Sequence, residues 1–243
     1  MKTLIASLLA IGAISSASAA VNCNTFPNNT IAGNVNDDVL AAGYSCTVGS
    51  SGFVNGSLTQ TGDGSLVIRG VVNGEVSEAG PGNVTIIRGN VSGGVSEADG
   101  GNLVVRNGGS ANGGLEESGG GSVTVTVDIP GVVNADIIEN GAGNVTVTAS
   151  SGSYEGSIIE NAGGNVEVSV DAGVSFKGSV EEYGSGDVTA DIFGLYEGNL
   201  VEYGIGNVIT GGDGTFKGNS EHQLPGTCTN SITEFEGTVC DLL

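Results

Sequence analysis

Apolar and polar residues alternate in short runs along most of the chain. In the segment Val123-Thr124-Val125-Thr126-Val127, for example, every second residue is apolar. Alternation with a period of two predicts β-strands that bury one face. Glycine-rich segments separate the runs, and glycine is favoured where a chain turns sharply. The pattern therefore predicts an all-β protein built from short strands and tight turns.

These runs belong to one unit that recurs nine times between about residues 53 and 228, at intervals of 18–22 residues. We number the unit from a small residue, called position zero, which the nine copies supply as Gly56, Gly74, Gly93, Gly113, Ala135, Gly156, Gly178, Gly198 and Gly218. Eight places later every copy has another glycine: Gly64, Gly82, Gly101, Gly121, Gly143, Gly164, Gly186, Gly206 and Gly226. A period near twenty, dominated by valine, threonine and glycine, predicts a single-stranded parallel β-helix (β-solenoid) of about nine coils.

The residues just before position zero indicate that the copies stack in register. Two places before it, the first five copies carry small aliphatic residues and the next four carry aromatic ones, namely Tyr154, Phe176, Tyr196 and Phe216. One place before it, Glu155, Lys177, Glu197 and Lys217 alternate in charge. In stacked coils, equivalent residues lie about 4.8 Å apart. Like rings and opposite charges would therefore be neighbours.

Residues 1–19 have the pattern of a secretory signal peptide. Lys2 precedes an apolar run from Leu4 to Ile14, and Ala17-Ser18-Ala19 offers a small-residue cleavage site. We therefore expect a mature chain that begins near Ala20 and is secreted, either extracellular or periplasmic. No later apolar run is long enough to suggest insertion into a membrane.

Four cysteines lie in two pairs, one near each end of the mature chain: Cys23 and Cys46, and Cys228 and Cys240. Disulfides are the default in an oxidising export compartment. Closing a local loop costs less entropy than closing a chain-length one, so we predict Cys23–Cys46 and Cys228–Cys240. We interpret residues 20–52 as an N-terminal cap with the first coil, 53–214 as the β-helix repeats, and 215–243 as the C-terminal coil and cap.

The motif V-x-G-x-φ-x-E-x-G-x-G-N-V-x-V, where φ is apolar, is best seen from Val72 to Ile86 and recurs over about three quarters of the chain. By this motif the chain resembles the large class of secreted right-handed parallel β-helix proteins. The resemblance implies an extracellular solenoid. Many proteins of that class cleave acidic polysaccharides.

Glutamate recurs four places after position zero in seven consecutive copies. We call this set the glutamate column: Glu78, Glu97, Glu117, Glu139, Glu160, Glu182 and Glu202. Gln60 precedes it and His222 follows it at the same position. Carboxylates about 5 Å apart repel by roughly 1 kcal/mol per pair in water, and by more at lower dielectric. Something must offset this repulsion.

Three interpretations of the column remain open. The glutamates could cap the following turn and accept hydrogen bonds from its N–H groups, or keep raised pKa values and stay partly protonated. They could instead bind calcium, a hard cation that prefers oxygen ligands, which makes calcium the candidate cofactor. A direct role in binding a ligand or substrate is the third. The sequence does not decide whether these side chains point inward, because the turn begins at the glutamate.

The chain contains 27 acidic and 6 basic residues, for a formal charge of −21. This balance argues against nucleic acid and anionic membranes as partners, since both require clustered basic residues. Arg69, Arg88 and Arg106 fall at similar places in three copies. They could form a basic stripe for a carboxylated sugar, but we favour ion pairs with glutamates. A row of threonines at Thr85, Thr124, Thr146 and Thr189 is typical of ice binding, but Val104, Glu167 and Ile209 interrupt it.

Repeated glutamates in equivalent surroundings do not resemble a catalytic site. A catalytic pair of carboxyl groups needs two different environments that separate the two pKa values. The short repeats also leave little room for loops that would build a cleft. We expect a secreted, non-catalytic, acidic β-helical rod that serves as a structural or adhesive module (an adhesin) at the cell surface or in extracellular matrix. The alternative is a cation-dependent β-helix protein that binds or cleaves a polysaccharide, with a divalent cation or an extracellular glycan as partner.

Overall fold

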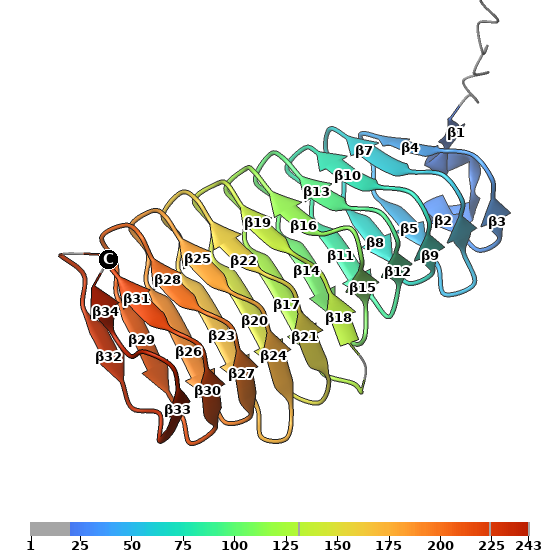
Figure 1. The fold of residues 1–243 in the computed structure, drawn as a ribbon. Coiled ribbons are helices and arrows are strands. Elements are labelled where there is room, and N and C mark those ends of the chain that lie inside the picture. The colour runs from blue at the N-terminus through green and yellow to red at the C-terminus, as the bar shows by residue number, and fades with distance from the viewer. Residues whose placement is uncertain (1–19, 131, 224, 243) are drawn as a thin grey trace, which may run out of the picture.

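The computed structural model describes residues 20–130, 132–223 and 225–242, which form a parallel β-solenoid of about 11 turns (Figure 1). The coils stack along one axis, with the first strands at one end of the rod and the last strands at the other. All the strand pairings between the described coils are parallel. The segment that we interpret as a signal peptide, residues 1–19, lies outside the described residues.

Each face of the solenoid is a sheet formed by strands from successive coils. Sheet A contains twelve strands: β1 (Val21–Asn22), β4 (Val39–Ala42), β7 (Leu58–Thr61), β10 (Val76–Ala79), β13 (Val95–Glu97), β16 (Leu115–Glu117), β19 (Ile137–Glu139), β22 (Ile158–Glu160), β25 (Val180–Glu182), β28 (Leu200–Glu202), β31 (Ser220–His222) and β34 (Asp241–Leu242). The glutamate column lies on this sheet.

Sheet B forms the second face and contains eleven strands: β2 (Thr30–Ile31), β5 (Cys46–Val48), β8 (Leu66–Ile68), β11 (Val84–Ile87), β14 (Leu103–Arg106), β17 (Val123–Val127), β20 (Val145–Ala149), β23 (Val166–Val170), β26 (Val188–Ile192), β29 (Val208–Gly211) and β32 (Cys228–Asn230). The interrupted threonine row lies on its outer face, where Thr85 pairs with Val104 and Thr146 pairs with Glu167.

The third face is divided into two shorter sheets. Sheet C contains β3 (Asn34–Val35), β6 (Phe53–Val54), β9 (Val71–Val72), β12 (Asn90–Val91) and β15 (Ser110–Ala111). Sheet D contains β18 (Val132–Asn134), β21 (Ser153–Glu155), β24 (Ser175–Lys177), β27 (Leu195–Glu197), β30 (Thr215–Lys217) and β33 (Glu234–Glu236). The described helical segments are two short 3₁₀ turns, η1 (Cys23–Thr25) and η2 (Pro27–Asn29). Neither is long or apolar enough to cross a membrane.

The core is a set of vertical columns, because equivalent residues of successive coils pair in register. Val76 pairs with Val95, and Glu78 pairs with Glu97. Alternate residues of each strand point inward, so the buried columns consist mainly of valine, leucine and isoleucine. The predicted single-stranded parallel β-solenoid is thus confirmed, and so is its register.

The solenoid has about 11 turns, slightly more than the nine predicted. The extra turns come from the chain ends, where the repeat signature is incomplete: the first coils lack the repeated glycines, and the last coil keeps Gly237 at position zero but has no glutamate of the column. At the N-terminus, β4 nonetheless pairs with β7, and Val39 and Ala41 are buried. At the C-terminus, β33 pairs with β30. Strand pairing needs only the alternation of inward and outward residues, so coils can continue where the repeat signature has faded.

The predicted column of aromatic rings is confirmed on sheet D. Tyr154, Phe176, Tyr196 and Phe216 are fully buried, and neighbouring rings stack with centroids 4.8–5.1 Å apart. Phe235 extends the column with a centroid distance of 4.6 Å to Phe216. The aliphatic members of the same position lie mainly on sheet C. The change from small to large side chains falls one coil after the division of the third face into two sheets, because Val133 on β18 already belongs to sheet D and pairs with Tyr154.

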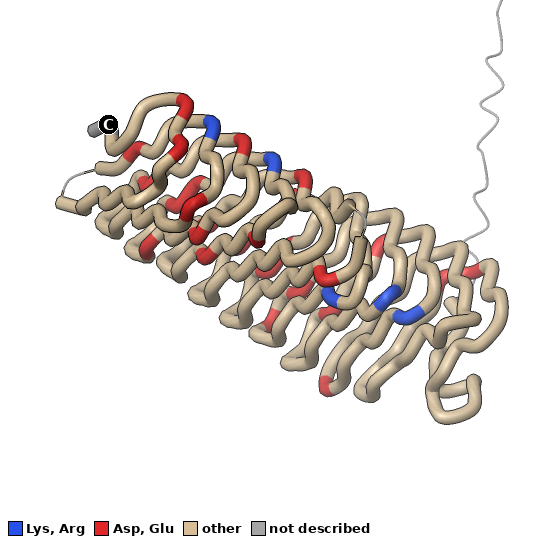
Figure 2. The backbone as a smooth tube through the Cα atoms, turned by 90° about the horizontal axis from the view of Figure 1, so that it is seen from below, with Lys and Arg blue, Asp and Glu red and all other residues tan. Residues whose placement is uncertain are grey.

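The alternating charges beside this column form a ridge on the surface (Figure 2). The ammonium group of Lys177 lies 3.9 Å from a carboxylate oxygen of Glu155 and 3.9 Å from one of Glu197. The ammonium group of Lys217 lies 3.4 Å from Glu236. Because these side chains are about half exposed, each pair contributes only about 0.2–1 kcal/mol. Their main effect is to favour this register over a shifted one.

Both predicted disulfides are present, one near each end of the rod. Cys23 is bonded to Cys46, with their Cα atoms 6.1 Å apart, and Cys228 is bonded to Cys240, with theirs 5.3 Å apart. The first bond links η1 to β5, and the second links β32 to the segment before β34. They cross-link the terminal coils, which have a neighbour on one side only.

Candidate functional site

All seven members of the glutamate column point into the solenoid. Their side chains are fully buried, as is that of Gln60. The alternation of each strand explains this direction: on β10, Val76 points inward, Ser77 outward and Glu78 inward again. The strand thus continues through the glutamate, and the turn follows it. The column is an internal feature of the fold and not part of its acidic surface.

One oxygen of the typical glutamate caps the turn that follows its own strand. Oε1 of Glu117 accepts hydrogen bonds from the N–H groups of Gly119 and Gly121, at 2.9 and 3.1 Å. Oε1 of Glu182 accepts the equivalent bonds from Gly184 and Gly186, at 2.8 and 3.2 Å. These N–H groups would otherwise lie unpaired at a buried corner, which is costly. Turn capping is therefore one role of the column.

The second oxygen has no such donor in most of the column. The Oε2 atoms of Glu97, Glu117, Glu139, Glu182 and Glu202 are buried and accept no hydrogen bond from an N–H or O–H group among the described residues. The neighbouring carboxyl groups of the column lie within hydrogen-bonding reach of each other. Two ionised carboxylates cannot form a hydrogen bond, since neither has a proton to donate. The column therefore requires shared protons or bound cations.

Burial raises the pKa values of several glutamates of the column, which favours their protonated form. It raises the pKa of Glu97 to about 7, that of Glu182 to about 8 and that of Glu139 to about 9. Hydrogen bonds to neighbouring carboxyl groups add to the effect at Glu139 and Glu182. A carboxyl group that leaves water without a counter-charge favours its neutral form.

Glu160, between Glu139 and Glu182, shows the opposite shift. Burial alone would raise its pKa, but hydrogen bonds from Glu182, from the N–H of Gly163 and from Glu139 together lower it. Both of its oxygens accept a hydrogen bond from Gly163, at 2.9 and 3.1 Å. The middle of the column is thus an alternation of acid, carboxylate and acid, in which protonated Glu139 and Glu182 donate to ionised Glu160.

The calcium interpretation of the column stays a prediction. Within the described part of the chain, no three or more His, Cys, Asp or Glu side chains are grouped so that they could hold a metal ion. Most coils offer one oxygen that is not already capping a turn, whereas calcium takes six to eight oxygen ligands. His222, on β31 beside Glu202, is only partly buried, and its Nδ1 atom has no described partner.

Calcium and protons would compete for the same oxygens of the column. We therefore expect millimolar calcium to leave the melting temperature unchanged near pH 6, and any stabilisation to appear only above about pH 8, where Glu182 and then Glu139 ionise. Thermal unfolding in calcium and in chelator at both pH values measures this. A rise of the melting temperature near pH 6 would contradict the competition. No shift at either pH would remove the calcium interpretation.

The three arginines are not in the environment that we favoured from the sequence. The ion pairs among described residues are made by Lys177 and Lys217, and none involves Arg69, Arg88 or Arg106. All three arginines are exposed. The interpretation as ion pairs with glutamates is therefore wrong. The glutamate column is buried on sheet A, whereas the arginines lie at the C-terminal ends of three neighbouring strands of sheet B.

The sequence also held a signal that we did not use, a pair of surface tyrosines. Tyr183 and Tyr203 stand five places after position zero in neighbouring repeats, and their rings stack at 4.6 Å. The side chain of Tyr183 is 45% exposed, and its hydroxyl donates to Glu181 at 2.6 Å. The two rings form a short aromatic surface at the edge of sheet A.

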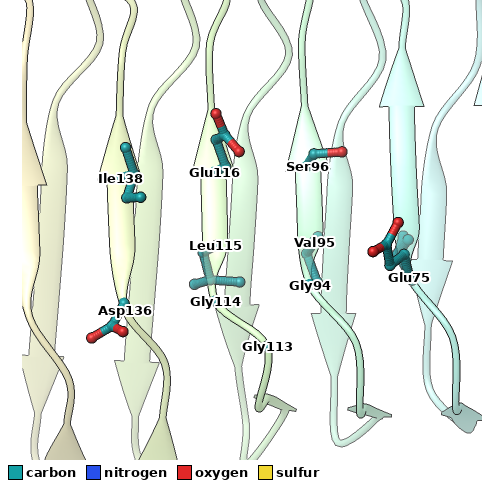
Figure 3. Close-up of a pocket in the computed structure, with 11 residues that line it drawn as sticks. Glu75, Gly94, Val95, Ser96, Gly113, Gly114, Leu115, Glu116, Asp136 and Ile138 are labelled. Atoms are coloured by element: carbon teal, nitrogen blue, oxygen red, sulfur yellow. The ribbon is translucent and has the colours of Figure 1, made fainter.

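A hollow of about 430 Å³ lies on the outer face of sheet A (Figure 3). Glu75, Glu116 and Asp136 bring carboxylates to it from three coils, together with Ser96 and Ile138. The three acidic side chains are exposed to solvent. Residues of the hollow include no histidine, cysteine or lysine that could act as a base or nucleophile. The hollow can attract a cation, but it does not provide two carboxyl groups in distinct environments.

Comparison of the chain with protein-family models, with curated proteins and with solved structures gives no match. The function is therefore inferred from the geometry of this chain alone.

Proposed function

We propose that the protein is an exported, non-catalytic, acidic β-solenoid rod that serves as a structural or adhesive module at the cell surface or in extracellular matrix. The observation that carries this proposal is the placement of the glutamate column. Its carboxyl groups are fully buried and spread evenly over seven coils. A substrate cannot reach such groups. They instead cap the turns of a stack of coils that must stay in register.

Features at the two ends of the chain support the export part of the proposal. The pattern of residues 1–19 is that of a secretory signal. The disulfides Cys23–Cys46 and Cys228–Cys240 suit an oxidising compartment. A covalent link in each terminal region also limits fraying of the exposed strand edges, which protects a rod outside the cell.

A second candidate function is cation-dependent binding or cleavage of a polysaccharide. The hollow on sheet A favours it, because Glu75, Glu116 and Asp136 line one open surface. A divalent cation held there could bridge these carboxylates to those of an acidic glycan. The proposed rod has no need of such a cation.

The experiment that separates the two functions uses the full chain, expressed with residues 1–19 and recovered from the medium. We expect the mature N-terminus of the secreted protein to lie near Ala20. The protein should release no reducing sugar from polygalacturonate in the presence of calcium. Beads coated with the protein should be retained on the surface of the cells that export it. Glu116→Gln tests the hollow, and Glu139→Gln is the matched change in the buried column.

Sugar release that Glu116→Gln abolishes and Glu139→Gln preserves would overturn the non-catalytic rod in favour of the second function. Failure of the chain to leave the cell, or of the coated beads to stay on the cell surface, would contradict the proposed site of action. Retention of the beads by wild type and by both variants, without sugar release, is the result expected of a structural or adhesive rod.

A further inference from the structure

Three of the five basic residues in the described part of the chain lie together at one corner of the solenoid. Arg69 directly follows β8, Arg88 directly follows β11, and Arg106 is the last residue of β14. These strands are neighbours in sheet B. The backbone N–H of Arg88 donates to the carbonyl oxygen of Arg106 at 3.4 Å. Figure 2 shows the basic positions gathered in two places, this corner and the ridge of alternating charges.

The two groups of basic residues differ in what they contact. The lysines of the ridge lie beside glutamates of adjacent coils. The three arginines have no described carboxylate within ion-pair distance, although the chain contains 27 acidic residues. All three are exposed to solvent. Like charges on neighbouring coils repel, so the fold gains nothing from their grouping.

A hollow of about 540 Å³ lies between these arginines. Arg69, Arg88 and Arg106 line it together with Ser50, Ile87 and Asn107. The guanidinium groups offer paired N–H donors that match the two oxygens of a carboxylate or a sulfate. Ser50 and Asn107 add neutral hydrogen-bonding groups, and Ile87 adds an apolar surface. This combination of acid-binding, polar and apolar groups suits a sugar ring that carries an acidic group.

The size and surroundings of the hollow select among anionic ligands. Three coils at about 4.8 Å per step place the arginines within ~10 Å along the rod, about the length of a disaccharide. The formal charge of the whole chain is −21. A nucleic acid, with closely spaced phosphates, would extend past the patch onto an acidic surface and be repelled. A polysaccharide with one acidic group per one or two sugars can place a short segment on the arginines alone.

We propose that Arg69, Arg88 and Arg106 form a binding site for the carboxylate or sulfate groups of an acidic polysaccharide, and that this site needs no divalent cation. The site would supply the ligand of an adhesive rod, so the extracellular class of the ligand rests on the proposed function. The chemistry of the site rests only on the arginines and their hollow. It also differs from the cation-dependent binding considered above, because the protein itself provides the positive charge.

Binding of labelled oligosaccharides to the full chain, in chelator and at low salt, tests the proposal. The probes are oligogalacturonate, which carries carboxylates, a sulfated dextran oligosaccharide, and neutral dextran as the control. We expect wild type to bind at least one of the acidic probes and not the neutral one, with affinity that falls as salt rises. The acidic probe that binds more tightly identifies the acid group.

The triple variant R69Q/R88Q/R106Q should lose affinity by at least about tenfold, since it removes every charged donor of the site. The double variant K177Q/K217Q is the matched control, because it removes the two basic residues that already have carboxylate partners; we expect a change of less than about twofold. Thermal unfolding of both variants checks that each retains the fold.

Several results would overturn the proposal. These are no binding of either acidic probe by wild type, unchanged binding by the folded triple variant, or an equal loss in the lysine control. The last result would mean that the overall charge of the protein, and not the group of three arginines, determines the affinity. Duplex DNA that binds as tightly as the oligosaccharides would overturn the choice of a glycan. Because the assay needs neither export nor adhesion, its failure is separate from a failure of the proposed function.

Discussion

The substitution Gly121→Ala should unfold the protein or lower its melting temperature by about 10 °C or more, whereas Gly120→Ala should leave the melting temperature nearly unchanged. A Cβ atom at Gly121 would lie 1.7 Å from the carbonyl oxygen of Gly101 in the coil below. That oxygen belongs to the backbone, so the clash can be relieved only if two coils separate. At Gly120 a Cβ atom would meet nothing within 4 Å.

The same close contact between successive coils recurs along the whole rod. At the glycine eight places after position zero, a Cβ would in most coils lie 1.5–2.0 Å from the preceding coil's glycine oxygen, as at Gly82, Gly101, Gly143, Gly164, Gly186 and Gly206. Gly121 also donates its N–H to Glu117, so a shift there would disturb the glutamate column as well.

Thermal unfolding followed by circular dichroism compares the two adjacent variants with wild type. Equal melting temperatures for Gly120→Ala and Gly121→Ala would show that the coils can separate at little cost, and that the repeated glycine has another cause. A large loss in both variants would show that the turn itself is sensitive, independent of coil contact.

Much of the fold could be predicted because a parallel stack aligns equal positions in space. The spacing of the repeats gave the coils, and the like residues before position zero gave the register. The pairing of Tyr154 with Phe176 and of Glu155 with Lys177 follows directly. The two disulfides were predictable for a related reason, since each links residues that the chain brings together within one or two coils. In a solenoid, neighbours in space are separated by about one repeat in sequence.

Two features could not be predicted from the repeat alone: the direction of the glutamate side chains and the number of coils. The inward direction of Glu78 requires β10 to continue through that residue before the turn at Gly80. The sequence allowed a turn that begins one residue earlier, which would have exposed the carboxylate. The number of coils was underestimated because the outer coils lack signature residues of the repeat: β4 keeps the alternation of inward and outward residues but has Ala41 where the column has Gln60 and then glutamate.

The predicted ion pairs of Arg69, Arg88 and Arg106 with glutamates were wrong for a different reason. Pairing the arginines with glutamates assumed that a cation in an acidic chain will find a carboxylate nearby. The repeat directs its most regular carboxylates into the interior of sheet A, while the arginines follow strands of sheet B. Net charge describes the whole molecule, whereas ion pairs depend on which corner of the coil a residue occupies.

The melting temperature of the protein should fall as the pH rises from about 5 to about 9, which reverses the usual loss of stability in acid. The pKa values of Glu97, Glu182 and Glu139 are raised to about 7, 8 and 9 in the folded state. Ordinary glutamates in an unfolded chain titrate near 4.3. The stability linked to these groups is therefore fully present below that value. It is lost as the pH rises through the folded-state values.

Around pH 6 the folded chain should bind about three more protons than the unfolded chain, one for each of these glutamates. Glu160, whose pKa is lowered, acts in the opposite sense. Its contribution is present above the unfolded value and is lost only in stronger acid. Thermal unfolding between pH 4 and pH 9 measures the net slope.

Glu139→Gln tests whether the column causes this slope. The amide keeps an oxygen that can accept the N–H of Gly141, as Glu139 does at 2.9 Å, and it replaces the shared proton with N–H groups that do not titrate. The chain already uses glutamine at this position in Gln60, which is fully buried. We expect the variant to melt roughly 5 °C or more above wild type near pH 9 and to match it near pH 5.

Glu116→Gln is the control, because Glu116 precedes Glu117 on the same strand but points outward and is exposed. It removes one negative charge without touching the column, so its pH profile should run parallel to that of wild type. If Glu116→Gln and Glu139→Gln flatten the profile equally, surface repulsion and not the buried column sets the pH dependence. If Glu139→Gln leaves the profile unchanged, the column does not hold the shared protons that its unpaired buried oxygens require.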